Sequence, residues 1–329
     1  MTEHESAPEG AARTGENETR GGPDVCVFAP VTLLTVTIER NEEGDEEVHL
    51  HAGGQGVWMA RMIVTLGGTP ALCSPLGGET GAVLRFLLGE EGIEARAVDV
   101  PGFSPVWVQD RRNGERQLIF ESPPPSLNRH DSDELYSLTL AEALAAKTCV
   151  FAGSHGSTTV VPDGMYRRLA ADLAASDVKT VADLSAGQLT EALEGGVHLL
   201  KVSSEELTRD GRARDASDKE LWRAIAELQS AGADNVVVSL GEAGLLAAVG
   251  GRRLVVRPPE LEVADARGAG DSMSGAFGLA LAKGHGWADV LRQGAAAGAM
   301  AVTRHGSGSG HAEAISALAE RVVLEVDQG

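Results

Sequence analysis

Residues 265–275 read DARGAGDSMSG, and this stretch does more than any other to decide the fold. The glycines at 268 and 270 let the backbone approach a ligand closely, because glycine carries no Cβ. Apolar residues follow at helical spacing up to Lys283-Gly284, so we expect a helix that begins in this stretch and ends there. Backbone N–H groups at the start of a helix form an anion site, which suits a phosphoryl group in transfer.

Asp271 lies in the first turn of that predicted helix, and two roles are open to it. The carboxylate can accept a proton from an attacking hydroxyl group, which makes it a candidate catalytic base. It can instead cap the helix, as aspartate often does at a helix N-terminus. Spacing alone does not separate the two.

Strand and helix patterns alternate along the second half of the chain. Short apolar runs predict buried strands at 149–151, 180–182, 199–201, 236–238 and 245–248. Helical patterns lie between most of them, most clearly at 163–176 and 219–231. Parallel strands need such crossover connections, so the sequence predicts an α/β fold with a mainly parallel sheet and helices on both of its faces.

Two hairpins interrupt this alternation in the first half. One covers residues near 34–52, and the other covers residues near 105–121, where Asn113-Gly114 is a dipeptide typical of hairpin turns. We interpret them as a small separate β layer that projects from the sheet and covers a site. Around them the sequence predicts strands at 25–29 and 71–73 and helices at 57–66 and 82–88.

The composition is strongly acidic, with 48 Asp and Glu against 28 Lys and Arg and a formal charge of −20. Such a surface repels nucleic acids and anionic membranes, so we expect neither as a partner. An anionic substrate would need a locally positive site. Residues 1–23 are polar and acidic without periodicity, which predicts a disordered tail before a folded domain at 24–329.

The three cysteines lie in separate apolar stretches and form no C-x-x-C pair, so we expect buried thiols in a reducing compartment. No signal-peptide pattern and no membrane-spanning apolar run is found, which predicts a cytoplasmic protein. There is no P-loop and no complete dinucleotide fingerprint. His49 and His51 lack metal-ligand spacing, and Arg111-Arg112 fits a solvated hairpin tip better than an anion site.

Two glycine-rich runs together carry a family resemblance. Residues 53–56 (GGQG) open the first predicted helix, and DARGAGD opens a late one. In this order and at this separation they resemble the signatures of the ribokinase-like PfkB carbohydrate kinases, over nearly the whole chain after the tail. Shorter runs resemble the branch of phosphofructokinase-B, 1-phosphofructokinase and tagatose-6-phosphate kinase, namely MAR (59–61), LGG (66–68), GGETG (77–81), VVSLG (237–241) and GDSM (270–273).

The resemblance implies a doubly wound α/β core with a small β-sheet lid that often forms a homodimer contact. It also implies transfer of the γ-phosphate of ATP, with Mg²⁺, to a hydroxyl group of a small molecule. Asp271 would be the base, and the backbone of Gly268, Ala269, Gly270 and Asp271 would form the anion hole.

The nucleotide side follows from further matches to the family pattern. Residues 201–207 (KVSSEEL) resemble the family's K-P-N-x-x-E-L run, which places Lys201 at the nucleotide and Glu206 at Mg²⁺, with Ser203 where asparagine is usual. Ser239 and Gly241 match the nucleotide-phosphate motif. The adenine pocket would include Ala296, within residues 296–303, and Gly306, within residues 305–308.

The acceptor side departs from the family pattern. Leu33 stands where the family has a sugar-binding aspartate, and in the run that contains Gly54 the usual lysine and asparagine are Gln55 and Trp58. Ser104-Pro105 replaces the lid's threonine and phosphate-binding arginine. A carboxylate that binds hydroxyl groups cannot become leucine without loss of affinity.

Two explanations remain open at these positions. Either the acceptor is a less polar or nucleoside-like alcohol with Trp58 as a stacking wall, or Leu33 and Trp58 simply pack beneath the lid. A nucleotide-binding regulator whose acceptor pocket has decayed is the alternative to an active kinase.

Overall fold

The computed structural model describes residues 21–154, 160–262, 267–303 and 310–327. The predicted tail at 1–23 falls almost entirely outside these ranges, so it stays a prediction. In the described part of the chain no helix is long and apolar enough to cross a membrane. All three cysteines are buried free thiols, as expected.

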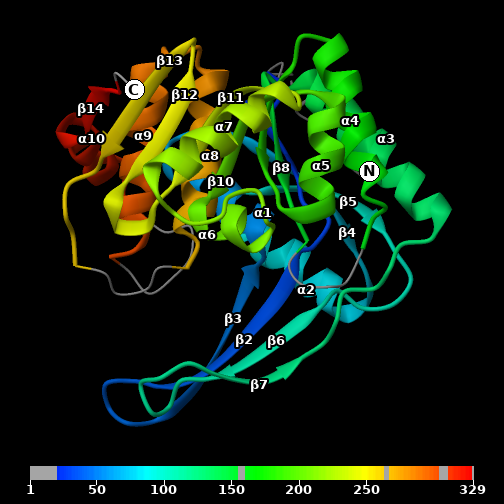
Figure 1. Cartoon of the computed structure of the whole chain (residues 1–329). Helices are drawn as coiled ribbons and strands as arrows, with labels where there is room; N and C mark the ends of the chain where they lie inside the picture. Colours follow the sequence, from blue (N-terminus) through cyan, green and yellow to red (C-terminus); the bar gives the residue numbers. More distant parts are fainter. Residues whose placement is uncertain (1–20, 155–159, 263–266, 304–309, 328–329) are drawn as a thin grey trace, which may run out of the picture.

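Within the described residues, ten strands form one large sheet in the order β14-β13-β12-β11-β10-β9-β8-β1-β4-β5 (Figure 1). The strands from β5 through β11 in this order pair in parallel, which confirms the mainly parallel α/β sheet. The bounds are β1 (Val25–Phe28), β4 (Pro70–Leu76), β5 (Glu94–Asp99), β8 (Thr148–Ala152), β9 (Lys179–Asp183), β10 (Val197–Ser203), β11 (Ala233–Ser239), β12 (Leu245–Val249), β13 (Arg252–Arg257) and β14 (Val323–Val326).

The last three strands depart from the parallel pattern. β12, β13 and β14 run antiparallel to their neighbours at one edge of the sheet. For β12 the reason is connection length, because only the short turn at residues 240–244 joins β11 to β12. A parallel neighbour would need a crossover of a dozen residues or more.

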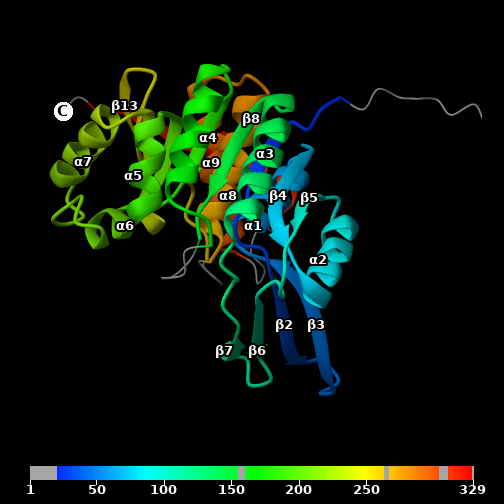
Figure 2. The ribbon, with the colours of Figure 1, turned by 90° about the vertical axis from the view of Figure 1, so that its right-hand side faces the viewer.

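Helices cover both faces of the large sheet (Figure 2). Side chains alternate along each strand, so Val25 and Val27 of β1 enter one core while Cys26 and Phe28 enter the other. The first core is closed by α1 (Gln55–Thr65), α2 (Gly78–Glu90), α8 (Ala269–Ala282), α9 (Trp287–Ala301) and α10 (Ala312–Arg321). The second is closed by α3 (Arg129–Ala145), α4 (Gly164–Ala175), α5 (Ala186–Gly195), α6 (Ser204–Arg209) and α7 (Asp218–Ser230).

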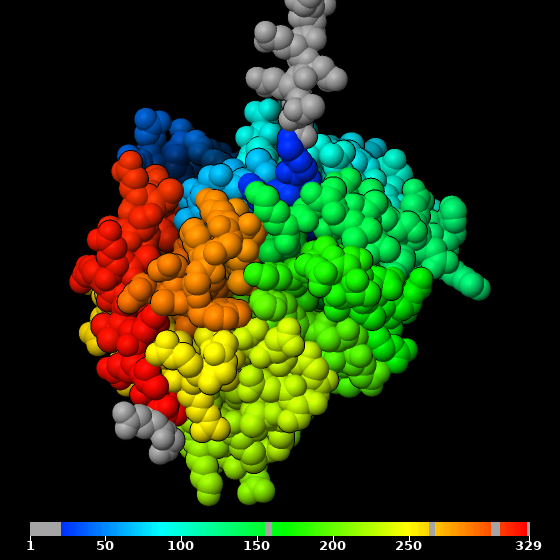
Figure 3. Space-filling model, turned by 90° about the horizontal axis from the view of Figure 1, so that it is seen from above, coloured from blue at the N-terminus to red at the C-terminus, as the bar shows by residue number. Residues whose placement is uncertain are grey.

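The space-filling view in Figure 3 shows these two helical layers from above. The orange and red C-terminal segments lie beside the green segments of the chain's middle. Helices that are far apart in sequence therefore meet across one sheet. The doubly wound arrangement follows from this two-sided covering, and it agrees with the predicted fold class.

A second, four-stranded sheet projects from the large one (Figure 1). Its order is β3-β2-β6-β7, with β2 (Leu33–Arg40), β3 (Glu46–Gly53), β6 (Val106–Asp110) and β7 (Gln117–Glu121). Each predicted hairpin forms, and the parallel pair of β2 with β6 joins the two hairpins. We call this the small sheet; it is the separate β layer that the hairpin patterns predict.

Candidate active site

The start of α8 lies at the carboxyl edge of the large sheet, where β9 and β10 end. Gly268 is the N-cap residue and adopts a left-handed conformation with φ of 75°, which favours glycine. Asp271 sits in the first turn and is only 9% exposed. Because the cap position belongs to Gly268, the interpretation of Asp271 as the capping residue is wrong.

A buried ion pair lies beside this turn. Lys201, near the end of β10, places Nζ 3.1 and 3.2 Å from the two carboxylate oxygens of Asp183, the last residue of β9. Ser274 of α8 donates its hydroxyl to the same carboxylate at 2.7 Å. Burial acts to lower the pKa of Lys201, but the carboxylates of Asp183, Glu206 and Asp271 outweigh it and raise that pKa. The ammonium group is therefore held in its charged form.

Lys201 also reaches the glycine-rich run. A Cβ atom placed on Gly270 would lie 2.4 Å from Lys201 Nζ, so the ammonium group sits directly against the Gly270 backbone. The first backbone N–H groups of α8 and this cation thus face the same small region. An anion there would meet both the positive end of a helix and a fixed positive charge.

The environment of Asp271 makes it a stronger base than an ordinary aspartate. Burial is the main cause, and the Asp183 carboxylate adds to it; together they raise the pKa of Asp271 to about 7. Lys201 and a hydrogen bond from Gln55 act in the opposite direction. A carboxyl group with a pKa near neutrality can take up a proton at physiological pH.

Gln55, the first residue of α1, is bound on all sides. Its Oε1 accepts the Gly153 N–H at 2.7 Å, and its Nε2 donates to the Asp183 carbonyl at 3.2 Å. The same side chain hydrogen-bonds to Asp271. Gln55, whose role as a substrate contact stays a prediction, therefore ties Asp271 to the carboxyl ends of β8 and β9.

Glu206 belongs to a capping box at the start of α6. Its Oε2 accepts the backbone N–H and the hydroxyl of Ser203, each at 2.8 Å, while Ser203 Oγ accepts the Glu206 N–H at 3.1 Å. Serine in place of asparagine thus fixes the rotamer of this glutamate. Oε2 is used by the cap, and Oε1 points elsewhere.

The predicted nucleotide residues that the structure describes occupy different environments. Ser239 ends β11 in register with Ser203 of β10, and Gly241 follows with φ of 61°. Ala296 is fully buried in the core between α8 and α9. Gly306 lies outside the described residues. The nucleotide roles of these residues stay predictions.

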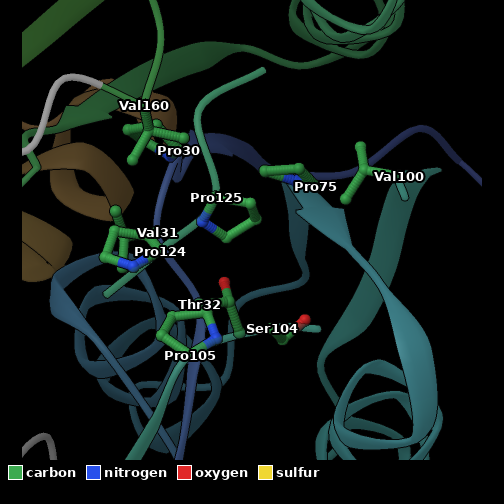
Figure 4. Close-up of a pocket in the computed structure, with 10 residues that line it drawn as sticks. All are labelled: Pro30, Val31, Thr32, Pro75, Val100, Ser104, Pro105, Pro124, Pro125 and Val160. Carbon is green, nitrogen blue, oxygen red and sulfur yellow. The ribbon is translucent and has the colours of Figure 1, made fainter. Parts of the chain in front are cut away.

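The predicted acceptor residues separate into two groups. Leu33 is 3% exposed and pairs with Gly53 at the base of the small sheet, and Gly54 adopts φ of 108° against the Val31 carbonyl. Pro105 lines a narrow apolar crevice of about 10 Å³, shown in Figure 4 together with Thr32 and four further prolines. This crevice has no room for a ligand.

Trp58 belongs to the second group, because it lines a cavity of about 470 Å³ between α1 and the small sheet. We call this the small-sheet cavity. His49 and His51 also line it, with their rings stacked at a centroid distance of 6.2 Å. Arg111 lines it as well, although the hairpin pattern favours a solvated tip. Among the described residues no cluster of Cys, His, Asp and Glu suits a metal ion.

Asp183 is the residue of the catalytic region that our sequence reasoning missed. A signal was available, because Asp183 directly follows the predicted strand at 180–182 and so lies at its carboxyl end. Ligand sites of α/β sheets form at that edge. Arg61 and Arg267, which line the small-sheet cavity, lie in the runs MAR and DARGAGD, but nothing in those runs assigned either arginine to a ligand.

Comparisons with known proteins agree with this geometry. The family model described as pfkB family carbohydrate kinase matches residues 28–314. The chain is 30% identical over 263 residues to ATP-dependent 6-phosphofructokinase isozyme 2 of Escherichia coli, covering 78% of this chain and 82% of that protein. It is 26% identical over 277 residues to D-tagatose-1-phosphate kinase of Bacillus licheniformis, covering 84% and 88%.

A solved structure gives the same result. The crystal structure of phosphofructokinase-2 from Escherichia coli in complex with potassium superposes with a TM-score of 0.80 at 25% identity, covering 91% of this chain and 99% of that one. The relatives include the phosphofructokinase and tagatose phosphate kinase branch that the short motifs resemble. The chain therefore belongs to the pfkB family of carbohydrate kinases, which are phosphotransferases with an alcohol group as acceptor.

Proposed function

We propose that this chain transfers the γ-phosphate of ATP to a hydroxyl group of a sugar or related small molecule, with Asp271 as the base. The observation that carries the proposal is the buried Asp271 carboxyl, whose pKa is raised to about 7 beside the positive start of α8. A base of this strength next to an anion site is what phosphoryl transfer to an alcohol requires.

In the proposed reaction the acceptor oxygen forms a bond to the γ-phosphorus while the bond from that phosphorus to the leaving oxygen of ADP breaks. The hydroxyl proton passes to Asp271. Gln55 keeps the carboxylate oriented, because its amide is anchored to Gly153 and Asp183. Asp271 returns the proton to solvent after the product leaves.

Negative charge on the transferred group is stabilised by two features of the chain. The backbone N–H groups of Ala269, Gly270 and Asp271 stand at the start of α8, and Lys201 Nζ lies against Gly270. Both are fixed before the reaction, so no reorganisation is needed as charge develops. Asp183 and Ser274 hold that lysine through the ion pair and its hydrogen-bonded neighbour.

The residues fit a magnesium ion bound mainly through water and phosphate. Mg²⁺ in kinases commonly uses one or two carboxylates and keeps several waters, and Glu206 offers Oε1 because the Ser203 bonds both go to Oε2. When bound, the ion would neutralise charge on the ATP phosphates. We propose that Glu206 holds it, with Ser239 and Gly241 near the nucleotide phosphates.

The second candidate function is a nucleotide-binding regulator without catalysis. A regulator has no need to bury a carboxylate beside a second carboxylate, an arrangement that costs stability. The pair Asp271 and Asp183 therefore favours the enzyme. A location in the cytoplasm and the absence of a nucleic-acid partner remain predictions.

We also propose that two copies pair through the small sheet. By register Val36, Ile38, Val48, Leu50, Val108 and Phe120 share one face of it. Phe120 is 55% exposed, and Val48 and Leu50 are exposed too. A contiguous apolar face on a projecting sheet is typical of an interface between subunits.

A screen for acceptors tests the proposed function. Wild-type protein is incubated with Mg-ATP and a panel of sugars, sugar phosphates, nucleosides and simple alcohols, and phosphorylated product is measured by mass spectrometry. We expect product from at least one class, and a loss of roughly 10²–10⁴-fold in Asp271→Asn. Nucleotide affinity of Asp271→Asn should stay near the wild-type value. ATP hydrolysis that needs no acceptor and is unchanged in Asp271→Asn would support the regulator instead.

A further inference from the structure

The small-sheet cavity is built from one face of the small sheet and from α1 above it (Figure 1). Register places Thr35, Thr37 and Glu39 of β2 beside His51 and His49 of β3 and beside Trp107 and Gln109 of β6. All of these residues line the cavity. Its volume of about 470 Å³ lies within the range of small-molecule sites.

This cavity is a positive region in an acidic protein. Its lining holds four arginines, Arg61, Arg111, Arg116 and Arg267, against two glutamates, Glu39 and Glu91. The whole chain, by contrast, carries a formal charge of −20. The arginines come from α1, the hairpin of β6 and β7, and the segment before α8, so segments far apart in sequence converge here. Convergent guanidinium groups favour an anionic ligand.

Flat rings form much of the rest of the wall. Trp58 faces the cavity from α1 and Trp107 faces it from β6. His49 and His51 stack on each other with an interplanar angle of 9°. Burial and the nearby Arg61 lower the pKa of His51, so this ring is neutral near pH 7. Indole and imidazole faces pack best against another flat ring.

Neither carboxylate of this lining is left to bind the hydroxyl groups of a ligand. Glu91 is held by Arg61 through two hydrogen bonds of 2.6 and 2.8 Å. Glu39 lies 3.3 Å from His49 Nε2 and 4.0 Å from Arg111. The two carboxylates in the lining are thus engaged with cationic or ring nitrogen groups, so hydroxyl groups of a ligand would have to bind Thr35, Thr37 or Gln109 instead.

Two segments that line the cavity also carry residues of the proposed catalytic centre. Trp58 lies one helical turn after Gln55 on α1, and Gln55 hydrogen-bonds to Asp271. Arg267 directly precedes Gly268, the N-cap residue of α8. A molecule in the cavity therefore lies against both segments that hold the base.

We propose that the small-sheet cavity binds the phosphoryl acceptor and that this acceptor is an anionic alcohol carrying a flat, unsaturated ring. The inference rests on the proposed function, since it names the acceptor of the same site. The arginines bind the anionic group, and the indole rings of Trp58 and Trp107 enclose the ring. In this acceptor the anionic group and the hydroxyl group that reacts are two separate groups of the same molecule.

A matched series of probes tests charge and ring separately. The first probe is 4-(hydroxymethyl)benzoate; benzyl alcohol lacks its charge, and 4-(hydroxymethyl)cyclohexanecarboxylate lacks its flat ring. Fructose 6-phosphate represents a sugar phosphate. Binding to the full-length Asp271→Asn protein is measured by NMR titration, which needs no phosphoryl transfer. We expect the benzoate to bind about tenfold or more tighter than each of the other three.

Each result decides one part of the proposal. If benzyl alcohol binds as tightly as the benzoate, the proposed need for an anionic group is wrong. If the cyclohexane acid binds as tightly, the proposed need for a flat ring is wrong. Tighter binding of fructose 6-phosphate overturns the substrate class. Arg111→Gln should abolish the preference for the charged probe and Trp107→Leu the preference for the flat one. Arg112→Gln is the matched control, because Arg112 pairs with Asp110 and Glu46 outside the cavity lining.

Turnover by wild-type protein is scored separately from binding. If the benzoate binds as expected but no member of a wider panel is phosphorylated, the proposed function fails while the ligand class stands. If another class is phosphorylated and the benzoate does not bind, the ligand class fails while the kinase stands.

Discussion

The catalytic edge of the large sheet and the lining of the small-sheet cavity are built in different ways. At the catalytic edge the decisive groups are backbone N–H groups of α8, one buried ion pair and one buried carboxyl, on segments packed against the main core. The small-sheet cavity is lined by long side chains from hairpins that project into solvent. One region is part of the core and the other is carried on its surface.

This difference explains why one region keeps the family pattern and the other does not. Changing Asp183, Lys201 or Asp271 would leave a charge buried without its partners. Changing Trp107 or Arg111 alters only a partly exposed lining, and the fold tolerates that. The proposed phosphoryl-transfer residues are therefore tied to stability, whereas the proposed acceptor residues are less constrained by the fold.

Lys201→Met gives the largest expected effect, because it leaves the Asp183 carboxylate buried without its cation. We expect the free energy of unfolding to fall by about 3–5 kcal/mol, measured by urea denaturation. Lys147→Met, which breaks the exposed pair with Asp24, should cost less than about 1 kcal/mol. Adding Asp183→Asn to Lys201→Met should recover part of the loss. If both lysine variants lose the same free energy of unfolding, the proposed difference between core and surface is wrong.

Gly270→Ala should have the next largest effect, in this case on kcat. Its Cβ would stand 2.4 Å from Lys201 Nζ and push the ammonium group off the anion site. Because the clash is with the end of a side chain and not with backbone, folding should survive while kcat falls roughly 10²-fold, the usual loss for one anion-hole donor. Gly89→Ala, which meets no atom within 4 Å, is the control within helix α2. Unchanged kcat in Gly270→Ala would place the anion site elsewhere.

A smaller effect concerns pH. The base must be ionised, so kcat/KM should rise with pH and reach half its maximum near pH 7, the pKa of Asp271. Gln55→Leu removes a hydrogen bond that lowers this pKa, so the midpoint should move upward by about one unit or less. Gln188→Leu removes an α5 side chain whose Oε1 accepts the Ser154 N–H, and it should leave the midpoint in place. A midpoint of the kcat/KM profile near pH 4 would show that Asp271, with its raised pKa, is not the titrating group.

The smallest expected effect on catalysis comes from the apolar face of the small sheet. Phe120→Arg puts a charge into the proposed contact between two copies, so light scattering should report a shift from dimer to monomer. Phe86→Arg, at a side chain 66% exposed on α2, should not change the mass. The rate at saturating acceptor should change little in either variant. A wild-type monomer would exclude this contact.

The sequence predicted the parallel strands and the two hairpins well, because a buried strand shows as an unbroken apolar run and Asn113-Gly114 marks a turn. It failed for α9, where alanine and glycine make up much of the helix and most residues are buried. It also missed the exposed strand β14 at the sheet edge. Periodicity reports burial on one side, so elements buried throughout or exposed throughout leave a weak pattern.

By itself the sequence determined the glycine-rich start of α8, the position of Asp271 on it and the loss of polar groups at Leu33, Trp58 and Pro105. These depend on residue type and on short spacing along the chain. Only the tertiary structure decided that Asp183 faces Lys201, that Gln55 binds Asp271, and that four arginines surround one cavity. Such contacts join residues tens to hundreds of positions apart, and they exist only because sheet order and strand register bring those segments together.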